Sequence, residues 1–190
     1  MKTIIAGLLA SLLVLCSLSA SANEIELLPI APDHVGLTVQ KSPVLYFYIS
    51  QATSLPIRFT LFDNRKVPPL VDVRLRSPTR PGYWAIRLED YGVVLEEEVQ
   101  YRWYVQPDLL GKEYFLGGVI ERIGWLTVGY IYDGPSCDKD AVRFLMKAGI
   151  WYDGFACLNE LIEANPEDRS LRVFRRELLK QIGVHLLDAN

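Results

Sequence analysis

The stretch Val99-Gln100-Tyr101-Arg102-Trp103-Tyr104-Val105 decides the fold class, because large apolar side chains alternate in it with more polar ones. A period of two is typical of a β-strand that buries one face and exposes the other. The members predicted to share the buried face are Val99, Tyr101, Trp103 and Val105. This run therefore predicts a strand that covers a hydrophobic core.

Further runs of the same kind lie on both sides of it, separated by turn residues such as Arg80-Pro81-Gly82. The predicted strands, in chain order, are 35–40, 44–50, 57–62, 70–76, 83–88, 99–105 and 114–122. No helical spacing interrupts them. The pattern predicts a mostly β domain over residues 23–132, an immunoglobulin-like antiparallel β-sandwich.

Tyr101 also fits the tyrosine corner of such sandwiches. It follows Leu95 by six residues and precedes Trp103 by two. In that motif the tyrosine hydroxyl forms a hydrogen bond with the backbone of the preceding loop. The alternative is an ordinary amphipathic strand, which can contain the same Tyr-x-Trp pattern.

Beyond residue 133 the apolar residues take helical spacing. Two or three helices are expected in residues 133–190, with Ser136 capping the first and Asn165-Pro166 opening the third. The predicted inward residues are Ala141, Phe144, Leu145, Ala148, Trp151, Phe155, Leu158, Ile162, Leu171, Phe174, Leu178 and Ile182. The helices are expected to pack on the sandwich as an integral part of it.

The second of these helices resembles the back half of a tetratricopeptide repeat. The matching positions are Gly149, Gly154, Leu158, Leu161 and Pro166. Such repeats need about three copies to be stable alone, and only about one is present here. Packing against the sandwich would supply the missing buried surface.

The first 22 residues have the form of a cleavable signal peptide. Lys2 is followed by an apolar run over residues 4–15 and by an Ala20-Ser21-Ala22 cleavage site. The run is shorter than the roughly 20 residues that span a bilayer. We therefore expect cleavage near Ala22, a periplasmic or secreted location, and no membrane-spanning segment afterwards. The alternative is a lipoprotein anchored at Cys16, which the bulky Leu15 before it disfavours.

Two cysteines, Cys137 and Cys157, lie beyond the signal segment. An oxidising compartment favours a disulfide between them, and two buried free thiols are the alternative. Antiparallel packing of the first two helices would bring them within the Cα distance that a disulfide needs.

Two surfaces are candidates for binding. Outward aromatic side chains are a candidate platform for a glycan or a peptide: Tyr83, Trp84 and Tyr104. A second candidate surface, for an envelope protein, combines two helical aromatics with basic residues at four-residue spacing: Trp151, Tyr152, Arg172, Arg176 and Lys180. The plainer alternatives are aromatic core filling and a solvated helix face.

Catalytic signatures are scarce. His34 beside Asp33 is the best candidate for a general base, and a hydrogen-bonded loop residue is the alternative. The motifs G-x-S-x-G, H-E-x-x-H and C-x-x-C do not occur, so no cofactor or metal is expected. The Glu96-Glu97-Glu98 run suggests a solvated loop, with a calcium site as the alternative. The net charge of −3 without a basic tract disfavours nucleic acid as a partner.

Four segments together resemble the domain of unknown function 928 family of exported bacterial proteins. They are Ala31-Pro32-Asp33-His34-Val35-Gly36-Leu37-Thr38, Tyr101-Arg102-Trp103, Gly118-Val119-Ile120-Glu121-Arg122 and Gly149-Ile150-Trp151-Tyr152-Asp153. The resemblance implies the fold and the compartment but no reaction. We therefore expect a non-enzymatic interaction module of the cell envelope; the alternative is a carbohydrate-binding module, and a hydrolase using His34 comes third.

Overall fold

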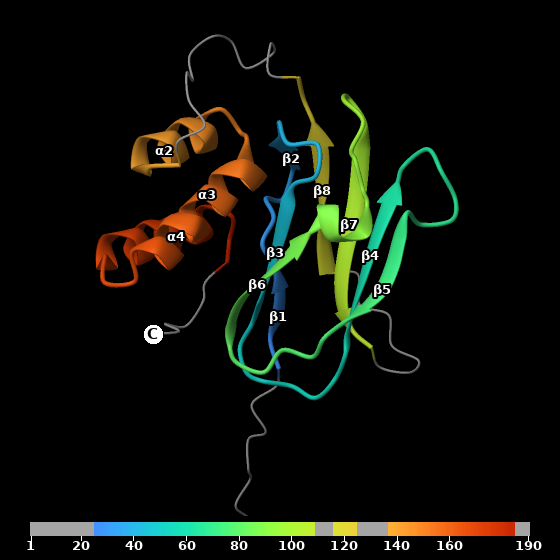
Figure 1. Cartoon of the computed structure of the whole chain (residues 1–190), viewed down its shortest axis with the longest axis horizontal. Helices are drawn as coiled ribbons and strands as arrows, with labels where there is room; N and C mark the ends of the chain where they lie inside the picture. Colours follow the sequence, from blue (N-terminus) through green and yellow to red (C-terminus); the bar gives the residue numbers. More distant parts are fainter. Residues whose placement is uncertain (1–24, 109–115, 125–136, 185–190) are drawn as a thin grey trace, which may run out of the picture.

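The computed structural model describes residues 25–108, 116–124 and 137–184, with the strands first and the helices last (Figure 1). The predicted signal segment with Cys16 and Ala22 lies outside these residues, as does the predicted cap Ser136.

The strands form two sheets. The small sheet has the order β1-β3-β6 and is antiparallel; its strands are β1 (Leu27–Pro29), β3 (Val44–Ile49) and β6 (Gly82–Arg87). The large sheet has the order β2-β8-β7-β4-β5; its strands are β2 (Val35–Thr38), β8 (Leu116–Arg122), β7 (Gln100–Pro107), β4 (Ile57–Asp63) and β5 (Val71–Leu75).

The pairing of β2 with β8 is parallel, so the expectation of a wholly antiparallel sandwich was wrong at this edge. The two strands lie far apart in the chain, and no hairpin forces them to run in opposite directions. The chain passes from β1 in the small sheet to β2 in the large one and enters the large sheet beside β8. This crossing brings residues near the start of the domain next to its last strand.

Alternation places the core between the sheets, as the sequence predicted. Along β7 the side chains of Tyr101, Trp103 and Val105 are buried, while their neighbours are more exposed. β4 alternates in the same way, from Ile57 to the buried carboxylate of Asp63. Pattern reasoning missed β1 and the short 3-10 helix Leu88–Tyr91, because three or four residues are too few to show a period.

The predicted tyrosine corner is present. The Tyr101 hydroxyl accepts a hydrogen bond from the backbone N–H of Glu96 at 3.0 Å. Leu95, beside that donor, is fully buried. The bond therefore fixes the loop before β7 to the strand that forms the centre of the large sheet.

The three helices are α2 (Lys139–Lys147), α3 (Trp151–Ala164) and α4 (Arg169–Gln181), and they lie on the side of the small sheet (Figure 1). Phe155 of α3 contacts Tyr46 of β3 and Tyr83 of β6, with ring centroids 5.3 and 6.2 Å apart. One hydrophobic cluster contains residues of both sheets and of all three helices. The predicted fold class, a mostly β sandwich with helices packed on it, is confirmed.

The helix starts differ from the prediction. Asp138 caps α2, since its side chain accepts hydrogen bonds from the N–H groups of Asp140 and Ala141. Asp168 caps α4 by accepting from Ser170 N–H, whereas Asn165 ends α3. The helix begins after Asp168 and not at Pro166. The aspartate side chain accepts a hydrogen bond from an N–H group that the first turn of the helix leaves unpaired.

We expect Tyr101→Phe to lower the free energy of unfolding by about 1 kcal/mol, because the Glu96 N–H loses its acceptor. Urea denaturation measures this. The matched control is Tyr91→Phe, since the Tyr91 hydroxyl has no hydrogen-bond partner among the described residues. Equal unfolding midpoints for both variants would show that the corner adds no stability.

Candidate functional site

The junction between the sandwich and α3 centres on Tyr152. Its hydroxyl accepts a hydrogen bond from Trp103 Nε1 at 2.9 Å and donates one to the carbonyl of Val119 at 3.1 Å. Tyr152 and Trp103 are buried, with 2% and 0% of their surface exposed. Burial raises the pKa of the Tyr152 hydroxyl. The hydroxyl therefore stays protonated and can donate its hydrogen bond to the Val119 carbonyl.

Two glycines make room for this ring. A Cβ atom on Gly36 of β2 would lie 2.6 Å from Tyr152 Cε2. A Cβ on Gly118 of β8 would lie 2.4 Å from the side chain of Ala31 and 3.1 Å from the Tyr152 hydroxyl. Glycine at these two positions of the parallel pair β2–β8 therefore leaves the space in which the Tyr152 ring lies.

Asp153, next to Tyr152, ties α3 to the end of β2. Its carboxylate accepts hydrogen bonds from Thr38 Oγ1 at 2.6 Å and from Val39 N at 2.8 Å. Burial raises the pKa of Asp153 to about 6, although both hydrogen bonds act to lower it. A carboxyl group with a raised pKa is a candidate for acid–base chemistry. Here both of its oxygens are bonded to the protein, and the arrangement is that of a structural tie.

The four segments that carry the family resemblance meet at this junction. β2 supplies Gly36 and Thr38, β7 supplies Trp103, β8 supplies Gly118, and α3 supplies Tyr152 and Asp153. Their meeting at one place was not predicted from the sequence. The signal that points to this arrangement is the pair of glycines in two predicted strands, because each marks a close approach by another group.

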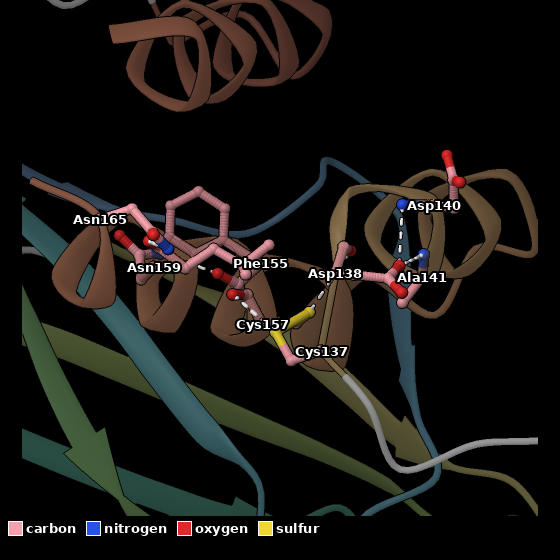
Figure 2. The surroundings of a disulfide bond; sticks show 9 residues. Cys137, Asp138, Asp140, Ala141, Phe155, Cys157, Asn159 and Asn165 are labelled. Carbon is pink, nitrogen blue, oxygen red and sulfur yellow. Dashed lines mark hydrogen bonds between the residues drawn. A yellow bond between two sulfur atoms is a disulfide. The ribbon is translucent and has the colours of Figure 1, made fainter. Parts of the chain in front are cut away.

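A disulfide joins Cys137 to Cys157, as predicted, with their Cα atoms 5.5 Å apart. Figure 2 shows the bond between Cys157 of α3 and Cys137, which directly precedes Asp138, the cap of α2. The bridge therefore anchors the start of α2 to the middle of α3.

Trp151 and Tyr152 were predicted to belong to a partner surface, and this was wrong. Trp151 is 8% exposed, stacks on Phe155 with centroids 5.9 Å apart, and belongs to the core. The separate prediction that Trp151 shares the inward face of its helix with Phe155 is confirmed. α3 has both the small sheet and the β2–β8 edge beside it, so both rings are covered.

The basic residues of α4 occupy different places. Arg176 and Lys180 are exposed, and Lys180 Nζ forms an ion pair with Glu177 at 3.0 Å. Arg172 is half-buried and donates to the carbonyl of Pro166. Arg175, in contrast, points inward, a placement that the sequence reasoning did not foresee.

Arg175 lies with its guanidinium carbon 3.9 Å from the ring centroid of Tyr83, and it donates to Asn159 Oδ1 at 2.7 Å. Burial lowers its pKa. Asn159 is itself buried and donates to the carbonyl of Phe155. This arginine therefore holds α4 onto α3 and β6 rather than facing a partner.

The predicted glycan platform is not formed as a unit. Tyr83 pairs with Tyr48 on the helix-facing side of the small sheet, where Arg175 covers it. Trp84 pairs with Phe47 and points the other way, toward the large sheet. Tyr104 lies on the outer face of the large sheet, opposite Thr60. Successive strand residues face opposite sides, so Tyr83 and Trp84 cannot share one surface.

His34 and the acidic run were the other candidates. His34 Nδ1 lies 3.0 Å from Asp33 Oδ1, and the two side chains are 70% and 95% exposed. Glu96 forms ion pairs with Arg65 and Lys66, which lower its pKa. Glu97 pairs with Arg122. The described residues contain no group of three or more side chains arranged to hold a metal ion.

The described helices also lack the combination of length and apolar character that crossing a membrane requires.

The fold and the junction define a class: β-sandwiches with a helical segment built into their edge. Residues 16–189 match the family model of the Domain of Unknown Function 928 (DUF928). The chain belongs to this family, as the resemblance predicted. No curated protein matches the chain.

The raised pKa of Asp153 leads to a prediction about pH. In the unfolded chain an aspartate releases its proton near pH 3.9, whereas the folded protein holds it to about pH 6. We therefore expect the contribution of Asp153 to the free energy of unfolding to be largest below pH 4. It should decrease as the pH rises to about 6, by on the order of 1 kcal/mol per pH unit.

The measurement compares the wild type with Asp153→Asn by urea denaturation across this range. Other titrating groups, such as Asp63 and Asp168, are present in both proteins, so the difference isolates Asp153. The wild type should lose stability relative to the variant as the pH rises from 4 to 6. A difference that does not change with pH would contradict a raised pKa.

We expect reduction of the Cys137–Cys157 bridge to lower the free energy of unfolding by about 3 kcal/mol, as loop entropy gives for a separation of 20 residues. Denaturation of wild type and Cys137→Ser/Cys157→Ser measures this. Peptide mass spectrometry without reduction should find the two cysteine peptides linked. Separate peptides, each with a free thiol, would show that the bond does not form.

Proposed function

We propose that the protein is an exported, non-enzymatic interaction module that binds an acidic partner protein of the cell envelope. The binding surface in this proposal is the basic face of α4, which consists of Arg172, Arg176 and Lys180, with Arg169 one turn earlier.

The observation that carries the proposal is the division of α4 into two faces. Leu171, Leu178 and Leu179 are buried in the core. Residues 169, 172, 176 and 180 recur at three- and four-residue spacing and therefore share another side of the helix, with Arg172 at its boundary with the buried face. A core-facing helix needs polar residues on its outer side, but it does not need them to share one sign of charge.

The charge of α4 differs from that of the whole chain. The helix sequence RSLRVFRRELLKQ contains five basic residues and one acidic residue, whereas the chain has a net charge of −3. A local positive field on a negative protein attracts and orients an acidic partner. Val173, which is 46% exposed beside these residues, adds apolar surface of the kind that protein interfaces bury.

Two features support export. The sequence begins with a segment of signal-peptide form, and the disulfide is of a kind that persists in oxidising compartments. Two features support a binding role without catalysis. Tyr152 and Asp153 use their polar atoms in bonds within the protein, and His34 and Asp33 are paired only with each other at a highly exposed site.

In-cell cross-linking of a tagged copy, followed by mass spectrometry, tests the proposal. We expect one envelope protein with an acidic surface to be captured in near-equal amount. The double variant Arg176→Glu/Lys180→Glu should lose most of this capture, because it reverses two exposed charges on the proposed face.

The matched control is Arg80→Glu/Lys147→Glu, which makes the same change of net charge elsewhere; both residues are exposed, and Lys147, like Lys180, lies in the last turn of its helix. The control should capture the partner as the wild type does. Equal losses in both variants would point to net charge alone. Undiminished capture in the α4 variant would exclude this face as the binding surface.

A further inference from the structure

The outer face of the large sheet carries an open depression. This face is turned away from the small sheet and from the helices, which lie on the opposite side of the molecule (Figure 1). The depression has a volume of about 240 Å³, and alternate residues of β4, β5 and β7 line it. Its position makes it a surface separate from α4.

One side of the depression is aromatic and apolar. Tyr104 of β7 and Phe62 of β4 have ring centroids 6.0 Å apart at an interplanar angle of 71°, and Pro69 completes this wall. A Cβ atom on Gly117 of β8 would lie 2.7 Å from Tyr104 Cδ1. The backbone carbonyl oxygen of Trp103 would lie closer still to that Cβ, so residue 117 must be glycine for the strand pairing itself, and the Tyr104 ring then packs over the bare backbone of β8.

The other side is polar and fixed in position. Arg58 donates from Nε and Nη2 to the two carboxylate oxygens of Asp72, at 2.6 Å each. This bidentate pair holds both planar groups in one orientation. The half-exposed amide of Gln106, opposite Arg58 in the register, adds hydrogen-bond donors and an acceptor at the same wall.

A second depression, of about 340 Å³, lies beside the first and shares Arg58 and Asp72 with it. Arg74 and Asp108, which form an ion pair, line this one. Both hollows lie at or near the lower end of the roughly 300–1,000 Å³ that drug-sized ligands occupy. Two small hollows side by side fit an extended ligand built of small repeating groups better than they fit one bulky cofactor.

We propose that the two adjoining depressions bind a neutral oligosaccharide, with one sugar ring against Tyr104 and the next beside the Arg74–Asp108 pair. A sugar ring has C–H groups on its flat faces, which pack on an aromatic ring. Its rim carries hydroxyls that both donate and accept, and these match the carboxylate, guanidinium and amide groups. Each arginine is paired with an aspartate, so the lining charges balance, and this favours an uncharged ligand over a phosphate or an acidic peptide.

The test is an NMR titration of the backbone amides with four probes: cellohexaose, maltohexaose, mannohexaose and chitohexaose. At least one should shift amides of β4, β5 and β7 at millimolar concentration or below. Tyr104→Ala should weaken that binding roughly tenfold, whereas Tyr104→Phe, which keeps the ring, should retain most of it.

Trp84→Ala is the matched control, because Trp84 is a half-buried aromatic of the small sheet. It should leave the affinity unchanged. Gln106→Ala removes an amide from the polar wall but no aromatic ring, and it should also weaken binding. This variant replaces Tyr104→Ala in the test if Tyr104→Ala does not fold. The proposal is overturned if no probe shifts these amides. It is equally overturned if the shifts lie on another surface, or if a polyglutamate peptide shifts these amides and the sugars do not.

Discussion

The hydrogen bond between the Trp103 indole and the Tyr152 hydroxyl ties the helical segment into the core of the sandwich. It joins the central strand of the large sheet to the first turn of α3 inside the core. A buried tyrosine hydroxyl must find partners, and this one finds a second in the carbonyl of Val119. The neighbouring strands β7 and β8 and the distant helix α3 are thereby joined at one oxygen atom.

Other features of the fold follow from this insertion. The ring needs a slot without side chains, and Gly36 and Gly118 provide it on neighbouring strands. These two strands are neighbours because β2 pairs with β8, in parallel, at the edge of the large sheet. Asp153 then ties the same turn of α3 to Thr38, and the disulfide fixes α2 to α3. The helices are therefore part of the sandwich rather than an addition to it.

This arrangement leaves two exposed surfaces on opposite sides of the molecule (Figure 1). α4 presents its basic face beyond the small sheet, and the large sheet presents the depressions around Tyr104. The sandwich lies between them, so the two proposed ligands would contact different sides of the molecule. Such a geometry suits a module that links a protein to a glycan.

The fold class and most strand positions could be predicted from the sequence, because they depend on local periodicity, as in the alternation along β7. The tyrosine corner was one of two interpretations of a short spacing, and the disulfide was favoured over free thiols from the expected compartment and helix packing. Three features became visible only in the tertiary structure: the burial of Tyr152, the inward direction of Arg175, and the three different faces on which Tyr83, Trp84 and Tyr104 lie. The periodicity of an element shows which residues share a side. It does not show what covers that side, because the cover comes from segments that are distant in the chain and meet only on folding.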